Sequence, residues 1–474
     1  MTGWVHEALG CAGFALAFLL LFIVGEVLRR VRRWNPEATR KTVHLAGCLI
    51  AMLFPVVLHS VWSVFALGCA FAAILLIAPR FNLLHAVNDV ERSASSVGGV
   101  THPLAIFICF FFANRLQMPV FYEIAMLVLA FSDSSAALTG MTYGRKKYLV
   151  EGDSRKSIEG SVIFFLCTFL IVEIMLLLFT GLTRIDCILL ALLIAFLVTL
   201  FEAISLHGTD NLFVPLGTIF ILAKNTDPST AELVFQFEAL ALSFAVALGL
   251  AYPYRKITRP GLVAIGLGIY TAWGLVGFAW AVPMFAALLL ICRTDWIMPE
   301  PKDEENAARV RTSFYLVVVP TIWLLAANLT WKLTGKPVQP LFYPGFLAAI
   351  AGQLLISRQK SRAAAGIMDS VPHLLADTVL LWAGLHASGF FVFARLEPCL
   401  GNIRVMVNVA EWATGGGLAL AVVAVIAALY RPVLHRWDEA SQKWFPRIRL
   451  FLVLPLTSLP NAAMFCLYGR KFFE

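Results

Sequence analysis

Residues 160–205 read GSVIFFLCTFLIVEIMLLLFTGLTRIDCILLALLIAFLVTLFEAIS, two apolar runs separated by a short polar turn. Each run, 160–181 and 186–205, reaches the roughly 20 residues that an α-helix needs to cross a bilayer. A backbone inside lipid must satisfy its own hydrogen bonds, and these runs lack the alternation of a β-barrel strand. The stretch therefore predicts two membrane-spanning helices.

The same pattern recurs through the whole chain of 474 residues, which is 60% hydrophobic and only 14% charged. A soluble domain carries roughly 25% charged residues, so this composition excludes a soluble protein. We expect an all-α, polytopic integral membrane bundle with roughly 13–16 spanning or re-entrant segments. Other long apolar runs lie at 8–28, 119–140, 232–251, 407–430 and 450–468.

The distribution of charge predicts an orientation in the membrane. The titratable side chains before the first apolar run are His6 and Glu7, and a cluster of basic residues follows the run. This order favours a signal-anchor with the N-terminus outside. Counting spans from there places the basic clusters on one side, the cytoplasm by the positive-inside rule. The lack of a transit peptide or retention signal favours a prokaryotic plasma membrane. No interleaved aromatic pattern points to nucleic-acid binding.

Polar content divides the chain into two predicted domains, 1–230 and 231–474. The first carries dense polar loops between its membrane segments, whereas the second consists mostly of apolar spans joined by short loops. We therefore expect the chemistry in the first domain and assign no role to the second. Asp377 is the one clear intramembrane acid of the second domain, and we assign it no role either.

The nine cysteines sit singly, most of them inside apolar runs. There is no CxxC pair, and we identify no Cys/His spacing typical of a metal site. The pattern favours small buried thiols over disulfides or zinc ligands.

An acidic residue stands inside an apolar run in DSSAALTGMTYG, residues 133–144. A carboxylate in a membrane helix is costly and is by default a functional candidate. At 100° per residue, Asp133, Ala136, Gly140 and Gly144 share one helix face. Small residues there would let a phosphate approach, or would let another helix pack closely. Packing explains the glycines but not Asp133.

The stretch RKSIEG, residues 155–160, opens the next apolar run. A helix N-terminus offers free N–H groups and positive dipole density, which suit a phosphate. Arg155 and Lys156 add fixed positive charge. The alternative is a cytoplasmic flank in which the basic side chains reach toward the headgroups and Ser157 caps the helix.

A third polar stretch follows Glu202 and includes HGTDN, residues 207–211. Asp210 and Asn211 offer hard oxygen ligands that suit Mg²⁺, or they form an Asx-rich turn between two helices. The next apolar run is only about 12 residues long and contains Pro215, which predicts a re-entrant or broken helix lining a polar cavity.

Two weaker elements complete the set, RKTVH at residues 40–44 and the Gly/Ser-rich SASSVGGVTHP at residues 93–103. The first lies at the mouth of the second span, and the second is interpreted as a loop that covers a nucleotide or simply connects two helices. With the N-terminus outside, all five elements lie at cytoplasmic ends of their spans. No GxxxxGK[ST] sequence supports a P-loop.

The order Asp133-x2-Ala136-x3-Gly140-x3-Gly144, followed by residues 155–160, resembles the signature shared by phytol, dolichol and other polyprenol kinases. That family commonly has Lys-Lys-Thr-x-Glu-Gly in the second block, and the spacer after Gly144 is slightly longer here. The elements at 40–44 and 202–215 also look like those of the family, in the same order. The resemblance covers roughly residues 38–225. Residues 311–353 faintly resemble the phytyl-phosphate kinase family.

The resemblance implies a CTP-dependent kinase that phosphorylates the hydroxyl of a long-chain isoprenoid alcohol at the cytoplasmic membrane face. Phosphoryl transfer needs positioning and charge neutralisation more than covalent chemistry, and the site residues follow from that requirement. We expect His44, Asp133, Lys156 and Glu202 to be catalytic, and Asp133, Glu202 and Asp210 to hold Mg²⁺. The nucleotide would contact Gly140, Gly144, Arg155, Ser157, Glu159, Gly160 and Asn211.

Three points stay open at this stage. Either His44 or Asp133 would accept the alcohol proton. A membrane cytidylyltransferase acting on a lipid phosphate would use the same metal ligands, and a non-enzymatic transporter or scaffold would use buried acids as relays or packing partners. For a kinase, we expect Asp133→Asn to abolish transfer with little loss of folding.

Overall fold

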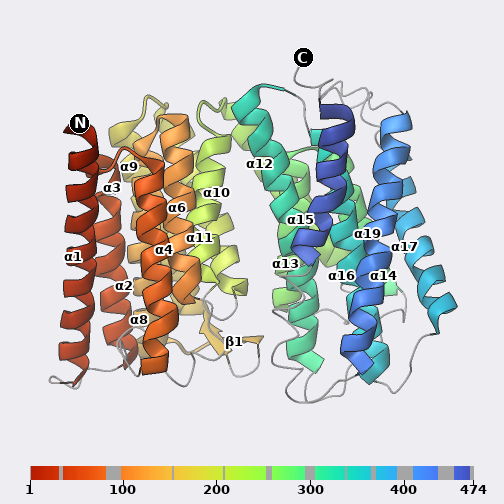
Figure 1. Ribbon diagram of the computed structural model, residues 1–474, viewed down its shortest axis with the longest axis horizontal. Helices are drawn as coiled ribbons and strands as arrows, with labels where there is room; N and C mark the ends of the chain where they lie inside the picture. Colours follow the sequence, from red (N-terminus) through yellow and green to blue (C-terminus); the bar gives the residue numbers. More distant parts are fainter. Residues whose placement is uncertain are drawn as a thin grey trace. The chain divides into compact units, whose positions relative to one another are not determined.

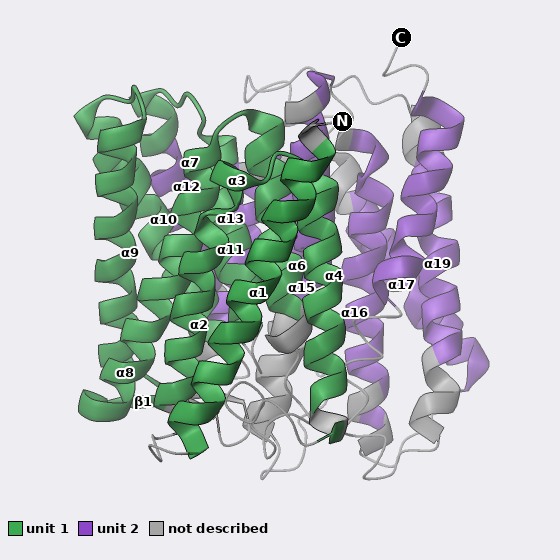
Figure 2. Ribbon diagram, turned by 60° about the vertical axis from the view of Figure 1, so that its left-hand side comes forward, with its two compact units in different colours: residues 1–234 green, residues 235–474 purple. Residues whose placement is uncertain are grey.

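The computed structural model describes residues 2–30, 36–81, 98–151, 154–205, 209–251, 259–293, 305–336, 339–364, 370–391, 409–435 and 453–469. The chain divides into two compact units, residues 1–234 and 235–474, which Figure 2 shows in different colours. Each unit is a helical bundle. The functional separation of the two parts of the chain stays a prediction.

Unit 1 contains one short hairpin among its helices (Figure 1). Its elements are α1 (Thr2–Arg30), α2 (Pro36–Met52), α3 (Phe54–Val57), α4 (Val61–Ile77), the 3₁₀ turn η1 (Ala78–Phe81), α6 (Gly98–Leu116), α7 (Pro119–Leu127), the π-helical turn η2 (Val128–Ser132), α8 (Asp133–Tyr143), β1 (Lys147–Glu151), β2 (Ser154–Ser157), α9 (Ile158–Phe179), α10 (Arg184–Ile204) and α11 (Asp210–Lys224).

Helix α12 (Thr230–Ala251) begins in unit 1 and continues into unit 2. The other described elements of unit 2 are α13 (Arg259–Leu275), α14 (Phe278–Arg293), α15 (Glu305–Thr334), the 3₁₀ turn η3 (Gln339–Leu341), α16 (Tyr343–Ala364), α17 (Val371–Phe391), α19 (Val409–His435) and a helix over residues 453–469.

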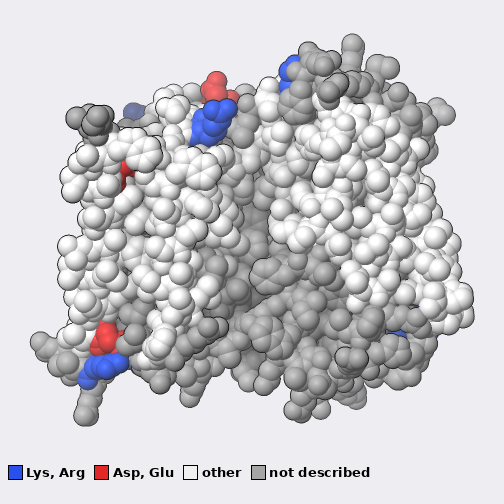
Figure 3. Space-filling view, in the orientation of Figure 1, with Lys and Arg blue, Asp and Glu red and all other residues white. Residues whose placement is uncertain are grey.

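The helices confirm an all-α, polytopic membrane protein. Six described helices are long and apolar enough to cross a bilayer, and six shorter apolar helices accompany them. The 13–16 segments expected for the whole chain include stretches outside the described residues. On the face drawn in Figure 3, most of the described charged side chains lie toward the top and the bottom, and most of the described residues between them are uncharged.

Helix α9 shows how an apolar sequence is divided between lipid and core. Val162, Leu166, Leu170 and Ile174 are exposed at four-residue intervals, so they form one stripe along the helix. The opposite face is buried against α8 and α10, with Phe164, Thr168, Val172 and Leu176. An exposed aliphatic stripe of this length suits contact with lipid tails.

The α7–η2–α8 segment lies in the interior of unit 1 and contacts α2, α9 and α11. Tyr122 is fully buried and donates a hydrogen bond of 2.8 Å to the backbone oxygen of Ala51 on α2. The hairpin lies at the end of unit 1 opposite the N-terminus (Figure 1). The contacts with α2, α9 and α11 fix the position of α8, and Gly140 of α8 lies next to Ser157 at the end of the hairpin.

Unit 2 has buried polar contacts of its own. Asn461 accepts a hydrogen bond of 2.7 Å from the backbone N–H of Gly345, and Arg358 of α16 pairs with Asp377 of α17 at 2.8 Å. Both charged side chains are mostly buried. Helix α16 therefore carries ionic groups into the interior of unit 2.

Three local expectations need correction. Residues 147–151 and 154–157 pair as two antiparallel strands, which the all-helical prediction did not contain. The segment at 93–103 is helical from Gly98 onward, and residues 93–97 lie outside the described part of the chain. Helix α11 runs unbroken through Pro215. Pro215 is the sixth residue of α11, so its missing N–H removes one intrahelical hydrogen bond without ending the helix. A re-entrant path for α11 stays a prediction.

Candidate active site

The first part of the site is an ion pair between α2 and α8. Lys41 Nζ donates to Asp133 Oδ2 at 2.6 Å, and both residues are more than 90% buried. His44 stands one helical turn after Lys41, and its Nε2 lies 3.6 Å from the same carboxylate oxygen. Asp133 thus faces the Lys41 ammonium group and the His44 ring.

A change in helical geometry places Asp133. Residues Val128–Ser132 form a π-helical turn, and Asp133 is the first residue of the α-helix that follows. A π-turn widens the helix by one residue and is frequent at functional sites. The turn is held from α9, since Thr168 Oγ1 donates to Ser132 Oγ at 2.9 Å.

The second part is an ion pair between the hairpin and α10. Lys156 of β2 donates to Glu202 Oε1 at 2.6 Å and to Ser205 Oγ at 2.9 Å, and also to the backbone oxygen of Glu202. Burial of the ammonium opposes its charge, but the carboxylates of Glu202 and Asp210 outweigh burial and raise the pKa of Lys156. Lys156 is therefore a fixed cation at physiological pH.

Asp210 adds a third carboxylate at the start of α11. An acidic residue is favoured there by the helix dipole, and Asp210 Oδ1 also accepts from the backbone N–H of Asn211 at 3.0 Å. Glu202 lies within electrostatic range of both Asp210 and Asp133. Three carboxylates and two lysines from α2, α8, β2, α10 and α11 therefore gather at one end of unit 1.

The glycine stripe of α8 packs against the start of α9. A Cβ added at Gly140 would lie 2.9 Å from Ser157 Oγ, and one added at Gly160 would lie 2.9 Å from the backbone oxygen of Ala136. Gly144 follows the end of α8 and meets Ser157 in the same way. Close helix packing thus accounts for the three glycines, and their contact with a nucleotide stays a prediction.

Ser157 and Glu159 support this junction. Ser157 is the N-cap of α9, where its Oγ accepts from the N–H of Gly160 at 3.1 Å. The carboxylate of Glu159 accepts from the backbone N–H of Lys146 at 3.2 Å. Both side chains fix the turn that presents Lys156. The side chain of Arg155 lies outside the described residues.

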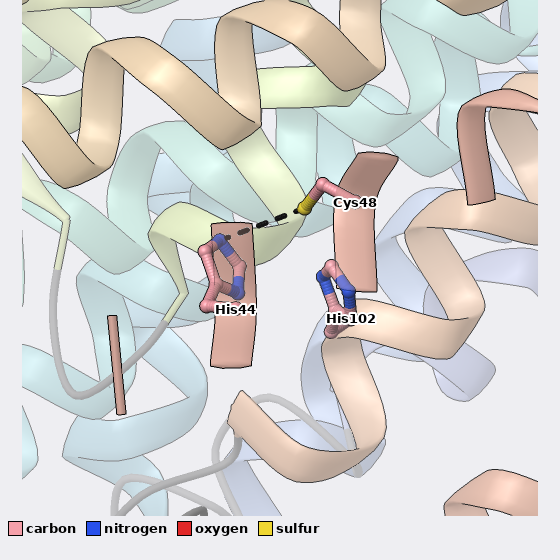
Figure 4. Close-up of side chains that lie close together, drawn as sticks. All are labelled: His44, Cys48 and His102. Carbon is pink, nitrogen blue, oxygen red and sulfur yellow. Dashed lines mark hydrogen bonds between the residues drawn. The ribbon is translucent and has the colours of Figure 1, made fainter. Parts of the chain in front are cut away.

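His44, Cys48 and His102 form a cluster (Figure 4). His44 Nε2 also lies 3.6 Å from Asp133 Oδ2. His44 and Cys48 are one turn apart on α2, with Nε2 and Sγ separated by 3.9 Å. His102 comes from the first turns of α6, and its ring centre lies 4.9 Å from that of His44. The three donor atoms lie within 4.8 Å of one another.

The structure adds residues that the sequence interpretation did not assign to the site. Lys41 was noted only as part of the 40–44 element, Ser205 only as part of the stretch after Glu202, and His102 only as part of a loop. Sequence analysis identified no Cys/His spacing typical of a metal site, although His44 and Cys48 are four residues apart and so share one helix face. The approach of His102 depends on the packing of the helices around α2, which local spacing does not reveal.

The arrangement suits chemistry on a phosphate. Lysine ammonium groups can neutralise phosphate oxygens, and the hard carboxylate oxygens can hold a divalent cation. His44 Nε2 and Asp133 Oδ2 are the two groups placed to accept a proton from a hydroxyl. All of these groups belong to unit 1.

Comparison with known proteins gives two matches. A family model described as the cytidylyltransferase family matches residues 5–204. The phytol kinase of Synechocystis sp. is 32% identical over 223 residues, which are 46% of this chain and 90% of that relative. No solved structure matches the chain. Because nearly the whole of that relative aligns at this identity, the chain belongs to the phytol kinase family of membrane phosphotransferases that act on an alcohol group.

Proposed function

We propose that this protein is a CTP-dependent kinase that phosphorylates the hydroxyl of a long-chain isoprenoid alcohol at the cytoplasmic face of a prokaryotic plasma membrane. The observation that carries the proposal is two ion pairs at one end of a membrane bundle, the buried pair Lys41–Asp133 and the part-buried pair Lys156–Glu202. Family membership supports a kinase acting on an alcohol. The match to the cytidylyltransferase family supports CTP as the nucleotide.

In the proposed reaction, the alcohol oxygen attacks the terminal phosphorus of CTP. A new O–P bond forms, the bond to the bridging oxygen breaks, CDP leaves, and the alcohol proton passes to a base. His44 Nε2 and Asp133 Oδ2, 3.6 Å apart, are the candidate bases. Lys156 neutralises charge on the transferred group, because a fixed cation aimed at developing charge stabilises the transition state.

The proposed reaction includes a Mg²⁺ ion. Asp133, Glu202 and Asp210 offer carboxylate oxygens, the ligand type that this ion prefers, and Glu202 interacts electrostatically with both Asp133 and Asp210. These three residues would hold the ion, and Asn211 would support them. When bound, Mg²⁺ would neutralise the negative charge of the nucleotide phosphates.

The lipid tail has a suitable environment beside the site. The exposed aliphatic stripe of α9 begins at Ile158, two residues after Lys156, and continues at Val162. A long isoprenoid chain can lie along such a surface while its hydroxyl stays at the polar end. Recognition of the alcohol would then depend on apolar contact, so we propose tolerance of chain length within the isoprenoid class.

The test is phosphate transfer by the purified full chain in detergent with Mg²⁺, γ-labelled CTP or ATP, and a panel of phytol, farnesol, geranylgeraniol, undecaprenol and dolichol. We expect label on an isoprenoid alcohol, from CTP in preference to ATP, with CDP as the second product. If no alcohol becomes labelled although Mg–CTP still raises the melting temperature of the protein, the proposed kinase activity is contradicted.

A second candidate is a cytidylyltransferase that acts on a lipid phosphate, favoured by the family model over residues 5–204. It would attach the cytidylyl group to the lipid and release pyrophosphate instead of CDP. The same reaction mixture separates the two activities, because α-labelled CTP marks the lipid only in the second. A transporter or scaffold would show neither product and no stabilisation by Mg–CTP.

A further inference from the structure

We propose that His44, Cys48 and His102 form a binding site for a thiophilic divalent transition metal of the Zn²⁺ class, and that the bound metal inhibits the kinase. Its nitrogen and sulfur donors differ from the carboxylate oxygens proposed to hold Mg²⁺. His44, however, belongs both to this site and to the proposed reaction. The inhibitory part of the inference rests on the proposed function. Binding of the metal does not.

The donor set selects a soft or borderline metal. Two imidazole nitrogens and one thiolate are ligands typical of Zn²⁺, whereas Mg²⁺ requires hard oxygen ligands. Cys48 is fully buried, and both histidines are mostly buried. His102 Nδ1 is buried and has no hydrogen-bond partner among the described residues. A buried imidazole nitrogen without a partner is destabilising unless something else satisfies it.

The geometry is close to that of a tetrahedral centre. With Zn–N and Zn–S bonds of about 2.0 and 2.3 Å, adjacent ligand atoms stand about 3.3–3.6 Å apart. The distance from His44 Nε2 to Cys48 Sγ is 3.9 Å, and all three donor atoms lie within 4.8 Å of one another. These separations are longer than those around a bound ion, so the three side chains would draw closer together when a metal binds. Figure 4 shows the three side chains gathered beside one another.

The local charge also suits a divalent cation. A thiolate at Cys48 supplies one negative charge, and the Asp133 carboxylate lies 3.6 Å from His44 Nε2. Asp133 is also within electrostatic range of both Cys48 and His102. Lys41 already pairs with Asp133 at 2.6 Å, so the thiolate is the group that balances the ion most directly. Three protein ligands and one remaining position are the arrangement of many zinc centres.

Occupation of this site would interfere with phosphate transfer. A metal bound to His44 Nε2 takes the lone pair that would accept the alcohol proton. The metal would also attract the Asp133 carboxylate away from Lys41. Inhibition by Zn²⁺ should therefore persist in excess Mg²⁺, which competes poorly for nitrogen and sulfur ligands.

The test uses the full chain in detergent, freed of metal by a chelator and titrated with Co²⁺ as a spectroscopic substitute for Zn²⁺. We expect visible d–d absorption and a thiolate-to-cobalt charge-transfer band, both abolished by Zn²⁺. Cys48→Ala and His102→Gln should weaken cobalt binding at least about 100-fold, since even residues behind the ligands affect affinity 10- to 100-fold. Cys109→Ala is the matched control, a fully buried cysteine outside the cluster.

The kinase assay supplies the second measurement. Zn²⁺ should inhibit the unmodified chain and Cys109→Ala in excess Mg²⁺, while Cys48→Ala should keep its basal activity and resist inhibition. A missing thiolate band, or a band that survives Cys48→Ala, would overturn the site whatever the kinase activity. A normal band without inhibition would overturn the regulatory part. A normal band in a chain without any kinase activity would overturn the proposed function and leave the metal site standing.

Discussion

Lys41 Nζ lies 2.6 Å from Asp133 Oδ2, and the two buried side chains are 92 positions apart in the sequence. This ion pair joins the second helix of the chain to the middle of unit 1. A buried charge is tolerated only when it is paired, so each residue depends on the other. The pair therefore links the stability of unit 1 to the chemistry proposed for Asp133.

Asp133→Asn should abolish phosphate transfer and also destabilise the protein. The substitution leaves the Lys41 ammonium buried without its carboxylate, and breaking a buried pair in this way costs about 3–5 kcal/mol. Sequence analysis predicted little loss of folding for this variant, because the partner of Asp133 was not visible. Thermal unfolding in detergent and turnover of labelled CTP measure the two effects.

A double variant separates the two effects. Lys41→Met combined with Asp133→Asn removes both charges, and it should recover much of the melting temperature that the single variant loses, without recovering activity. Equal melting temperatures for the single variant and the unmodified protein would show that the pair contributes nothing to the fold. Activity in the double variant would exclude Asp133 and Lys41 from the reaction.

The sequence predicted the membrane bundle because long apolar runs carry a direct physical requirement for helix. It also drew attention to Asp133 and Glu202, since acids in apolar runs need an explanation. It did not predict the pairing of Lys41 with Asp133, because residues 92 positions apart meet only through tertiary packing. It did not predict the hairpin either, because a short basic segment such as residues 154–157 is equally typical of the flank of a membrane helix.

Lys156→Ala should lower turnover at least about 100-fold, the range found when a charge-stabilising donor is removed from an active site. Lys147 is the matched control, because it lies on the other strand of the same hairpin and is exposed. Lys147→Ala should keep nearly full turnover with the same panel of alcohols. Equal losses in the two variants would mean that only the net charge of the hairpin matters.

The raised pKa of Lys156 predicts a pH dependence of stability. A group whose pKa is raised by folding stabilises the protein fully below its ordinary value, here 10.5, and loses that contribution as the pH rises through the folded value. The comparison is with Lys156→Met/Glu202→Gln, which lacks both charges. We expect the difference in melting temperature between the unmodified chain and this variant to stay constant from neutral pH to about 10.5. Above that pH, the melting temperature of the unmodified chain should fall relative to that of the variant. A loss of this difference that is complete below pH 10.5 would mean that folding does not raise the pKa of Lys156.

Gly160→Ala should destabilise unit 1 and reduce turnover. The new Cβ would meet the backbone oxygen of Ala136, which has little freedom to move, and overpacking of this kind costs about 1–3 kcal/mol. Displacement of α9 would also move Ser157 and the neighbouring Lys156. Gly181→Ala is the control, because a Cβ at Gly181 meets nothing within 4 Å. Similar melting temperatures for the two variants would contradict the close packing of α8 on α9.

Asp377→Asn tests whether the chemistry is confined to unit 1. Arg358 Nε lies 2.8 Å from Asp377 Oδ2 between α16 and α17, and every residue assigned to the proposed reaction lies in unit 1. The Synechocystis phytol kinase also aligns over only 46% of this chain. The variant leaves Arg358 without this carboxylate, so it should lower the melting temperature. Turnover per folded molecule should nevertheless equal that of the unmodified protein, measured after size-exclusion chromatography.

Arg358→Gln/Asp377→Asn, which removes both charges, serves as the control for folding. A loss of turnover in this double variant, with its melting temperature restored, would mean that unit 2 takes part in the reaction.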